Sequence, residues 1–195
     1  GSLTLELSAS DIDSNDLILS ASASNGSATV DGTTLTVTPI ANYNGDATVT
    51  VEVTDGEYTS ATEFILTVNP VNDAPVLSAL DDDSIAEDTA FTLELSGSDV
   101  DGDDLTFSAS ASNATATVEG TVLTVTPAAD YNGTIIVSVT ANDGALDGIG
   151  SFILEVTPVN DAPVVATISD QVIDEDSSLT LELSASDIDG DAVTF

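Results

Sequence analysis

Apolar and polar residues alternate with a period of two along most of this chain, as they do in a β-strand with one buried face. The segment Phe91–Leu95 shows the pattern, and apolar residues stand at positions 135, 137 and 139 and again at 152, 154 and 156. Turn-forming residues return about every 8–12 positions, and no stretch has the 3.6-residue period of a helix. The pattern therefore predicts an all-β protein.

An internal repeat orders these segments. The stretch Pro70–Val76 returns as Pro158–Val164, a shift of 158 − 70 = 88 residues, and Asp11–Asp13 returns as Asp99–Asp101 and Asp187–Asp189. Such a period indicates tandem structural units. We expect a first repeat over residues 1–72 that lacks its first strand, a complete repeat over 73–160, and a truncated third repeat over 161–195. We also expect the chain to be an excerpt from a longer tandem array.

The complete repeat contains about seven short strands, which begin near residues 76, 91, 105, 115, 122, 135 and 152. Asp31-Gly32 and Glu119-Gly120 predict two-residue hairpin turns. About seven short strands with frequent turns are typical of an antiparallel, Ig-like β-sandwich. The prolines around each Asn-Asp pair stiffen the connector between repeats. Sandwiches joined in this way are expected to stack end to end.

The charge of the chain limits the classes of partner that it can bind. It has 35 acidic residues and no Lys, Arg or His, for a net charge of −35. No salt bridge between side chains can form, and neutralisation has to come from cations. Nucleic acid is excluded as a partner, and anionic membranes are disfavoured. No run approaches the roughly 18 apolar residues of a membrane span.

Catalysis is poorly supported by this composition. The chain has no His, Cys or Lys, so only carboxylates are left for acid–base work. The same acids recur in every repeat, whereas a catalytic pair needs one special pocket. We therefore expect a protein that is not an enzyme.

Four acidic clusters recur per repeat at strand ends or turns, and in the complete repeat they are Glu87-Asp88, Asp99–Asp103, Asp143-Gly144 and Asn160-Asp161. An Asp-x-Asp pair in an extended chain places both carboxylates on one face, about 6.6 Å apart at the backbone. Ca²⁺ takes about 6–8 oxygen ligands in irregular geometry, more than one cluster supplies. A junction between repeats could combine several clusters. The alternative is that the acids form a solvated surface.

These motifs resemble a known family. Asn160-Asp161-Ala162-Pro163, Asp99–Asp103, Ala86–Thr89 and Ala141–Gly144 are similar to the calcium motifs of cadherin repeats, and more closely to the bacterial cadherin-like tandem repeats of large surface adhesins and fibres. In that family the ions lie between consecutive repeats. The resemblance implies Ca²⁺ as the cofactor.

The same resemblance implies the ligands. At the second junction they would be Glu87, Asn160, Asp161, Asp187 and Asp189, and at the first Asn72, Asp73, Asp99, Asp101 and Asp143. The residues 88 positions away from four of these ligands are further candidates: Asp11, Asp13, Asp55 and Glu175. Cadherins have an Asp-x-Glu pair where this chain has Asp130-Tyr131-Asn132, so Asp130 is a further candidate, although one carboxylate is lost there.

The functional expectation is a calcium-stiffened extracellular rod, as the stalk of an adhesin or the subunit of a bacterial surface fibre. Its partners would be calcium ions, neighbouring repeats and, in a filament, other copies at its side. A ligand-binding adhesin module and an accessory domain of a secreted enzyme are the alternatives. Tyr43 and Tyr131 precede Asn-Gly turns, where sandwiches often hold a structural tyrosine, and we favour that role over sugar stacking.

Overall fold

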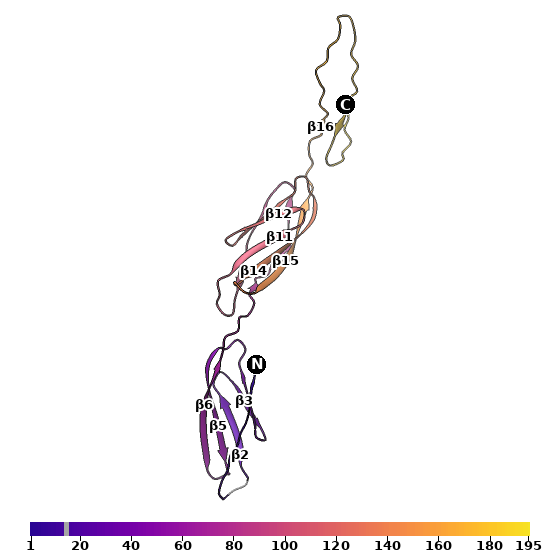
Figure 1. Ribbon diagram of the computed structural model, residues 1–195. Helices are drawn as coiled ribbons and strands as arrows, with labels where there is room; N and C mark the ends of the chain where they lie inside the picture. Colours follow the sequence, from indigo (N-terminus) through magenta and orange to yellow (C-terminus); the bar gives the residue numbers. More distant parts are fainter. Residues whose placement is uncertain (14–15) are drawn as a thin grey trace. The chain divides into compact units, whose positions relative to one another are not determined.

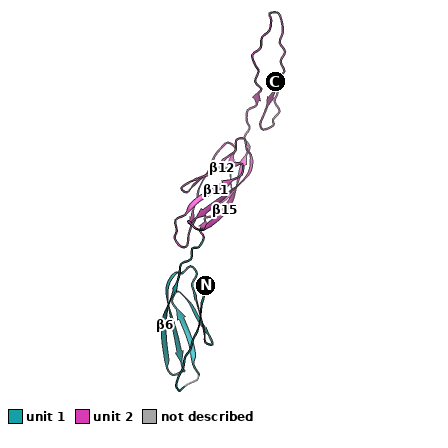
Figure 2. Ribbon diagram, in the orientation of Figure 1, with its two compact units in different colours: residues 1–73 teal, residues 74–195 magenta. Residues whose placement is uncertain are grey.

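The computed structural model describes residues 1–13 and 16–195 and is built from β-strands (Figure 1). The chain forms two compact units, residues 1–73 and 74–195 (Figure 2). Within the described part of the chain, no helix is long and apolar enough to cross a membrane.

The first unit is a sandwich of two three-stranded sheets. Its strands are β1 (Leu3–Glu6), β2 (Ile18–Ala23), β3 (Gly26–Asp31), β4 (Thr34–Pro39), β5 (Gly45–Thr54) and β6 (Thr59–Val68). One sheet has the order β1-β4-β3 and the other β2-β5-β6. The alternating apolar side chains of β4 and β5 meet between the sheets and form the core of Leu35, Val37, Val49 and Val51.

The second unit contains a fuller sandwich. Its strands are β7 (Val76–Leu77), β8 (Asp83–Ala86), β9 (Phe91–Glu94), β10 (Gly97–Ser98), β11 (Thr106–Ala111), β12 (Ala114–Glu119), β13 (Val122–Pro127), β14 (Gly133–Asn142) and β15 (Asp147–Thr157). The sheet β12-β13-β9 faces the sheet β11-β14-β15-β8, and β7 pairs with β10 at one end. The predicted Ig-like sandwich is confirmed.

The core of this sandwich follows the period-two pattern. Leu123 and Val125 of β13 face Ile135 and Val137 of β14, and all four have no exposed surface. At one end the rings of Phe91 and Phe152 lie 5.7 Å apart, with 48° between their planes. The residues that alternate with the buried ones along the two strands, Thr124 in β13 and Ile136 in β14, point outward and are at least partly exposed. Alternation therefore places one residue in two in the core.

The expectation of purely antiparallel pairing is wrong for one strand. β8 runs parallel to β15, with Leu154 opposite Asp83, although β7 pairs antiparallel with β10. The chain changes sheets between β7 and β8, where the Ile153 backbone N–H donates to Asp82 Oδ1 at 2.7 Å. The first strand predicted near residue 76 is thus the short β7, and β8 is a further strand, in a different sheet, that the sequence pattern did not predict.

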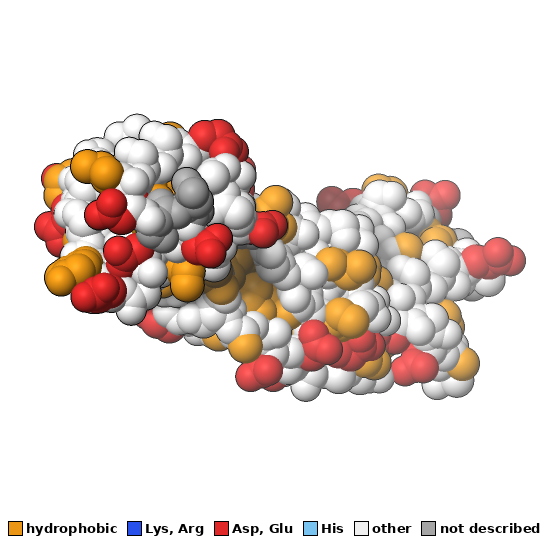
Figure 3. Space-filling model, turned by 90° about the horizontal axis from the view of Figure 1, so that it is seen from below, with side chains coloured by type: hydrophobic (Ala, Val, Ile, Leu, Met, Phe, Trp, Pro, Cys, Tyr) orange, Lys and Arg blue, Asp and Glu red, His pale blue; other side chains and the backbone are white. Residues whose placement is uncertain are grey.

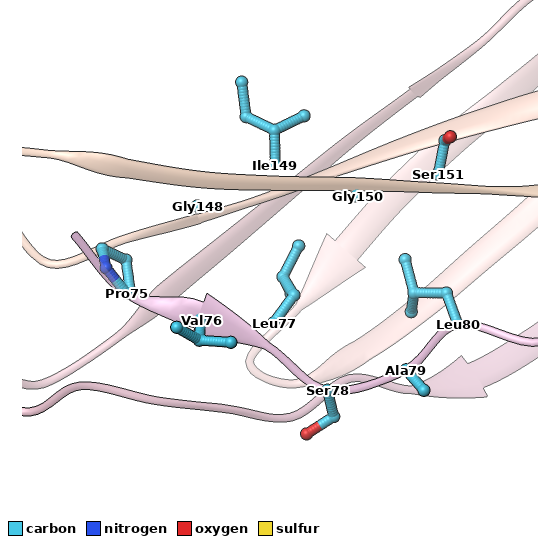
Figure 4. A pocket seen from close by; sticks show the side chains of 10 residues that line it. All are labelled: Pro75, Val76, Leu77, Ser78, Ala79, Leu80, Gly148, Ile149, Gly150 and Ser151. Atoms are coloured by element: carbon cyan, nitrogen blue, oxygen red, sulfur yellow. The ribbon is translucent and has the colours of Figure 1, made fainter.

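Glycines allow this first segment to lie close to β15. A Cβ on Gly148 would stand 2.0 Å from the carbonyl oxygen of Pro75, and one on Gly150 would touch Leu80 and Leu77 at 3.2 and 3.3 Å. Figure 4 shows Leu77 and Leu80 pointing toward the strand that carries these glycines, while Ile149 points away. Residues 75–80 and 148–151 together line a shallow, largely apolar groove.

The hairpin turns lie one residue later than predicted. Asp31 pairs with Thr34, so the two-residue loop is Gly32-Thr33, and in the second unit Glu119 pairs with Val122. Gly32 has a φ of 62°, which a glycine adopts without steric cost. The acidic residue therefore ends the strand and the glycine begins the loop.

Residues 161–195 form few regular strands. β16 (Val164–Val165) pairs with β17 (Ala185–Ser186), one repeat length after the β7–β10 pair. The 88-residue repeat carries the strands predicted near residues 91 and 105 to residues 179–183 and to Phe195, but no strand is formed at either place. In the preceding sandwich their counterparts β9 and β11 pair with β13 and β14, and the residues up to 195 include no counterpart of either partner.

Both candidate tyrosines have a structural role. The Tyr43 hydroxyl donates to the carbonyl oxygen of Asp46 at 2.7 Å, and the Tyr131 hydroxyl to that of Thr134 at 3.0 Å. These bonds tie the loop before β5 or β14 to the strand that follows, as a tyrosine corner does.

Candidate metal centre

Glu87 is the buried member of the acidic clusters, with 3% of its surface exposed. Its backbone N–H donates to the carbonyl oxygen of Thr157 at 2.9 Å, which extends the β8–β15 pairing by one step. Its Oε1 accepts the Val159 N–H at 2.5 Å, and its Oε2 lies 3.5 Å from Asn132 Nδ2. The pairing of β8 with the last strand therefore places this carboxylate beside the connector that leaves the sandwich.

Asp88 and Asp130 form a second group beside it. Both have left-handed backbone conformations, with φ of 58° and 55°, and the Asp130 N–H donates to Asp88 Oδ1 at 3.2 Å. Aspartate and asparagine tolerate this conformation better than most residues. The repeat positions Asp176 and Asn42 also have it, with φ of 63° and 59°. The local geometry thus recurs, but the first unit has an amide where the second has the Asp130 carboxylate.

The connector brings in Asp161. Asn160 Nδ2 donates to the Asp161 carbonyl oxygen at 2.9 Å, and the Asp161 N–H donates to Asp189 Oδ2 at 2.6 Å. Asp187 Oδ1 accepts the N–H groups of Asp189 and Asp191 at 3.0 and 3.4 Å. The turn that Asp187 stabilises therefore presents Asp189 to the connector.

These contacts bring carboxylates from distant segments together. Single oxygens of Glu87, Asp161 and Asp189 lie within 4.8 Å of one another, and so do those of Asp88, Asp130 and Asp161. Asp161 belongs to both groups, which we call the Glu87 cluster and the Asp130 cluster. Carboxylate oxygen is the ligand that Ca²⁺ and Mg²⁺ prefer, and three carboxylates leave room for the water and carbonyl oxygens of a six- to eight-coordinate Ca²⁺. The donor set fits a hard divalent cation.

The electrostatics agree with that fit. Partial loss of hydration raises the pKa of Asp161, and the negative charges of Asp130, Asp189, Asp88 and Glu87 raise it further. Like charges at this spacing oppose the ionised state. The chain has no Lys, Arg or His to relieve them. A bound cation would remove this repulsion.

Other candidate residues hold turns in the structure. Asp143 Oδ1 accepts the N–H groups of Ala145 and Leu146, both at 2.7 Å. Asp55 Oδ1 accepts those of Glu57 and Tyr58 at 2.9 and 2.7 Å, and these bonds lower its pKa. Each carboxylate thus stabilises the turn before the last strand of its sandwich.

The Asp-x-Asp motifs share one arrangement. Asp99 Oδ1 accepts the Asp101 N–H at 2.8 Å, and Asp11 Oδ1 accepts the Asp13 N–H at the same distance. The other oxygen of Asp99, Oδ2, is buried and has no hydrogen-bond partner among the described residues. The first aspartate of each motif therefore shapes a turn that leaves the second one at the surface.

The remaining candidates lie outside both clusters. Asn72 Nδ2 donates to the Asp73 carbonyl oxygen at 3.2 Å, as Asn160 does to Asp161, and this pair ends the first unit. Glu175 is exposed. Of the predicted ligands, the structure brings together Glu87, Asp130, Asp161 and Asp189, while Asp187 and Asn160 shape the backbone beside them.

Asp88 is the residue that the sequence reasoning missed as a ligand candidate. It follows Glu87 directly, and the Glu-Asp pair recurs at 175 and 176. The preference of aspartate for the left-handed region was the available signal. In an extended strand Asp88 would point away from Glu87. The left-handed turn instead aims it at Asp130.

The fold and the 88-residue repeat define the class of this protein as tandem Ig-like β-sandwiches. Residues 3–69 match the family described as cadherin-like domain, and residues 72–149 match the family described as bacterial Ig domain. The resemblance drawn from the motifs is confirmed. Cadherin-like domains commonly bind calcium, and such Ig-like domains are in general non-catalytic.

One characterised relative is chitinase A of Pseudoalteromonas piscicida, which is 30% identical over 155 residues. The match covers 74% of this chain but only 18% of the chitinase. Among solved structures, human protocadherin-24 EC1-2 is similar with 15% identity and a TM-score of 0.48, covering 81% of this chain and 88% of that one. The endo-fucoidan hydrolase MfFcnA4 of glycoside hydrolase family 107 has 23% identity and a TM-score of 0.37, covering 82% and 26%.

Proposed function

We propose that this chain is a calcium-braced structural segment of an extracellular protein. The observation that carries the proposal is the meeting of Glu87, Asp161 and Asp189, which come from the sandwich, the connector and the segment beyond it. One ion would be shared by Glu87, Asp161 and Asp189, although the first two are 161 − 87 = 74 positions apart along the chain and the last two 189 − 161 = 28. Calcium would therefore fix the connector against the sandwich.

Calcium suits the site better than a transition metal. The cluster offers carboxylates, and the chain has no His or Cys. Extracellular modules bind Ca²⁺ with Kd of about 10⁻⁴–10⁻³ M, which matches surroundings rich in the ion. Binding would also stabilise the folded state by mass action.

Repeated along a longer chain, such braced connectors would make an extended stalk or a fibre of a bacterial cell surface. The Asn-Asp pair at 72–73, with Asp99, Asp101 and Asp143, is the set proposed for the preceding connector. The net charge of −35 makes added cations necessary for close approach of repeats, and of copies that associate laterally.

A second candidate function is an accessory segment of a secreted enzyme. It is favoured by the match to chitinase A, of which this chain spans less than a fifth. Catalysis would then belong to another part of the protein. Binding of the chain to insoluble chitin, with and without Ca²⁺, would separate the two functions, because a pure spacer stays in solution.

The test of the calcium brace is backbone hydrogen exchange across residues 158–164 with and without millimolar Ca²⁺. We expect Ca²⁺ to slow exchange there in the wild type and not in Asp161→Asn. Glu119→Gln removes an equal charge at the end of β12, outside both clusters, and should behave like the wild type. Equal protection in wild type and Asp161→Asn would contradict the proposal.

A further inference from the structure

Asn132 stands beside the Glu87 cluster without belonging to it. Its side chain is exposed, and its Nδ2 lies 3.5 Å from Glu87 Oε2. Gly133 follows it and begins β14 with a φ of 123°. An exposed carboxamide followed by a glycine is thus placed next to a buried carboxylate.

An Asn-Gly pair is the dipeptide most prone to deamidation, because glycine has no side chain to hinder its nitrogen. The deprotonated Gly133 nitrogen attacks Asn132 Cγ, the new N–Cγ bond closes a five-membered succinimide, and the Cγ–Nδ2 bond breaks. The leaving group takes up a proton and departs as ammonia. Water then opens the ring to aspartate or isoaspartate, so the net change exchanges an amide for a carboxylate.

The repeat offers a matched pair in the first unit. Asn44 is also exposed, and Gly45 has a φ of 117°. A Cβ on either glycine would find the same neighbours, the hydroxyl oxygen and Cζ of the preceding tyrosine at 3.5 and 3.8 Å. The position equivalent to Glu87 would be 87 − 88 = −1, outside this sequence. The two sites therefore share local chemistry and differ in the adjoining carboxylate.

The third Asn-Gly pair is held more tightly. Asn25 Nδ2 donates to the Tyr43 hydroxyl at 3.0 Å, and a Cβ on Gly26 would lie 2.7 Å from the Thr38 carbonyl oxygen. The closure of a succinimide ring requires movement that these contacts oppose.

We propose that Asn132 is a deamidation site, and that its conversion to aspartate adds a carboxylate to the Glu87 cluster and tightens cation binding there. The effect on cation binding rests on the proposed function. The added charge beside Glu87 disfavours the ion-free state and favours the ion-bound one. More ligand charge is one of the means by which protein sites tighten their hold on Ca²⁺.

Two measurements on the full chain test the proposal. The wild type is incubated at mildly alkaline pH, cleaved with chymotrypsin (trypsin finds no Lys or Arg), and mapped by mass spectrometry for the gain of about 1 Da. We expect conversion at Asn132 and Asn44 and much less at Asn25. If Asn132 stays unmodified in a sample in which Asn44 is converted, Asn132 is not a deamidation site.

The second measurement is Ca²⁺ titration of Asn132→Asp, with Asn44→Asp as the control of equal charge. We expect about tenfold tighter binding for Asn132→Asp and an unchanged value for the control. If Asn132→Asp is unfolded without Ca²⁺, recovery of its circular dichroism on Ca²⁺ addition reports the same coupling. Wild-type binding with no gain in Asn132→Asp overturns the inference alone, whereas a wild type that binds no Ca²⁺ overturns the proposed function.

Discussion

Asp161 is the residue on which both carboxylate clusters depend. Its backbone N–H is bound to Asp189, and its side chain faces Asp130, Asp88 and Glu87. A raised pKa in the folded state means that ionisation of this group opposes folding at pH above that pKa. The same arrangement favours folding once a cation is bound.

Replacement of Asp161 should therefore have opposite effects in the two states. In the ion-free protein, Asp161→Asn removes a repelled charge, and we expect an equal or higher Tm at neutral pH. With Ca²⁺ present, the variant should lose most of the Ca²⁺-induced rise in Tm. Calorimetry with EDTA and with millimolar Ca²⁺ measures both, and a variant that is equally destabilised in the two buffers would contradict the electrostatic account.

Asp55 predicts a pH dependence of the opposite sign. Its backbone hydrogen bonds lower its pKa below the model-peptide value of 3.8, so its contribution to stability is present above pH 3.8. As pH falls through the lowered pKa, that contribution is lost. We expect Asp55→Asn to have a lower Tm than the wild type at pH 6 and a difference that shrinks in strong acid, as followed by circular dichroism between about pH 2 and 7.

At the scale of the element, the period-two pattern predicted the long strands of the sandwich and its two-sheet fold. It did not reveal β8, because the sequence Asp83-Ser84-Ile85-Ala86 has no period-two alternation. The parallel pairing of β8 with β15 depends on Asp82 and Gly148, whose partners are about 70 residues away in sequence. Similarly, recurrence marked Glu87 and Asp161, but only the left-handed turns join Asp88 to Asp130.

The close approach of the first segment to β15 can be tested with a pair of glycines. Gly148→Ala would place a methyl group 2.0 Å from the Pro75 carbonyl oxygen, which is rigid backbone. Gly150→Ala would meet only the mobile ends of Leu77 and Leu80. We expect the first change to lower the free energy of unfolding by about 1–3 kcal/mol, as overpacking does, and the second to cost less. Urea unfolding compares the two, and equal costs would mean that β7 is free to shift.

At the scale of the whole molecule, the dominant fact is a net charge of −35 with no basic side chain. On the face shown in Figure 3, acidic side chains are scattered among polar and hydrophobic ones, and no basic colour appears. Exposed charges of one sign repel each other over about a Debye length, which is roughly 30 Å at 0.01 M salt and 8 Å at 0.15 M. Two kinds of cation relieve this repulsion: diffuse counterions, and ions held by the carboxylate clusters.

Because both kinds of cation relieve the repulsion, the effect of chelation on Tm should depend on the salt concentration. Chelation should lower Tm more at about 0.01 M NaCl than at 0.5 M, because at low salt the diffuse counterions screen the uncovered carboxylates less. Asp161→Asn should show a smaller difference between the two salt concentrations than Glu119→Gln, since only the first residue belongs to the clusters. Scanning calorimetry of both variants at both salt concentrations, with EDTA or Ca²⁺, provides the comparison. If chelation shifts Tm equally at both salt concentrations, the bound ion acts through coordination geometry and not by relieving the net charge.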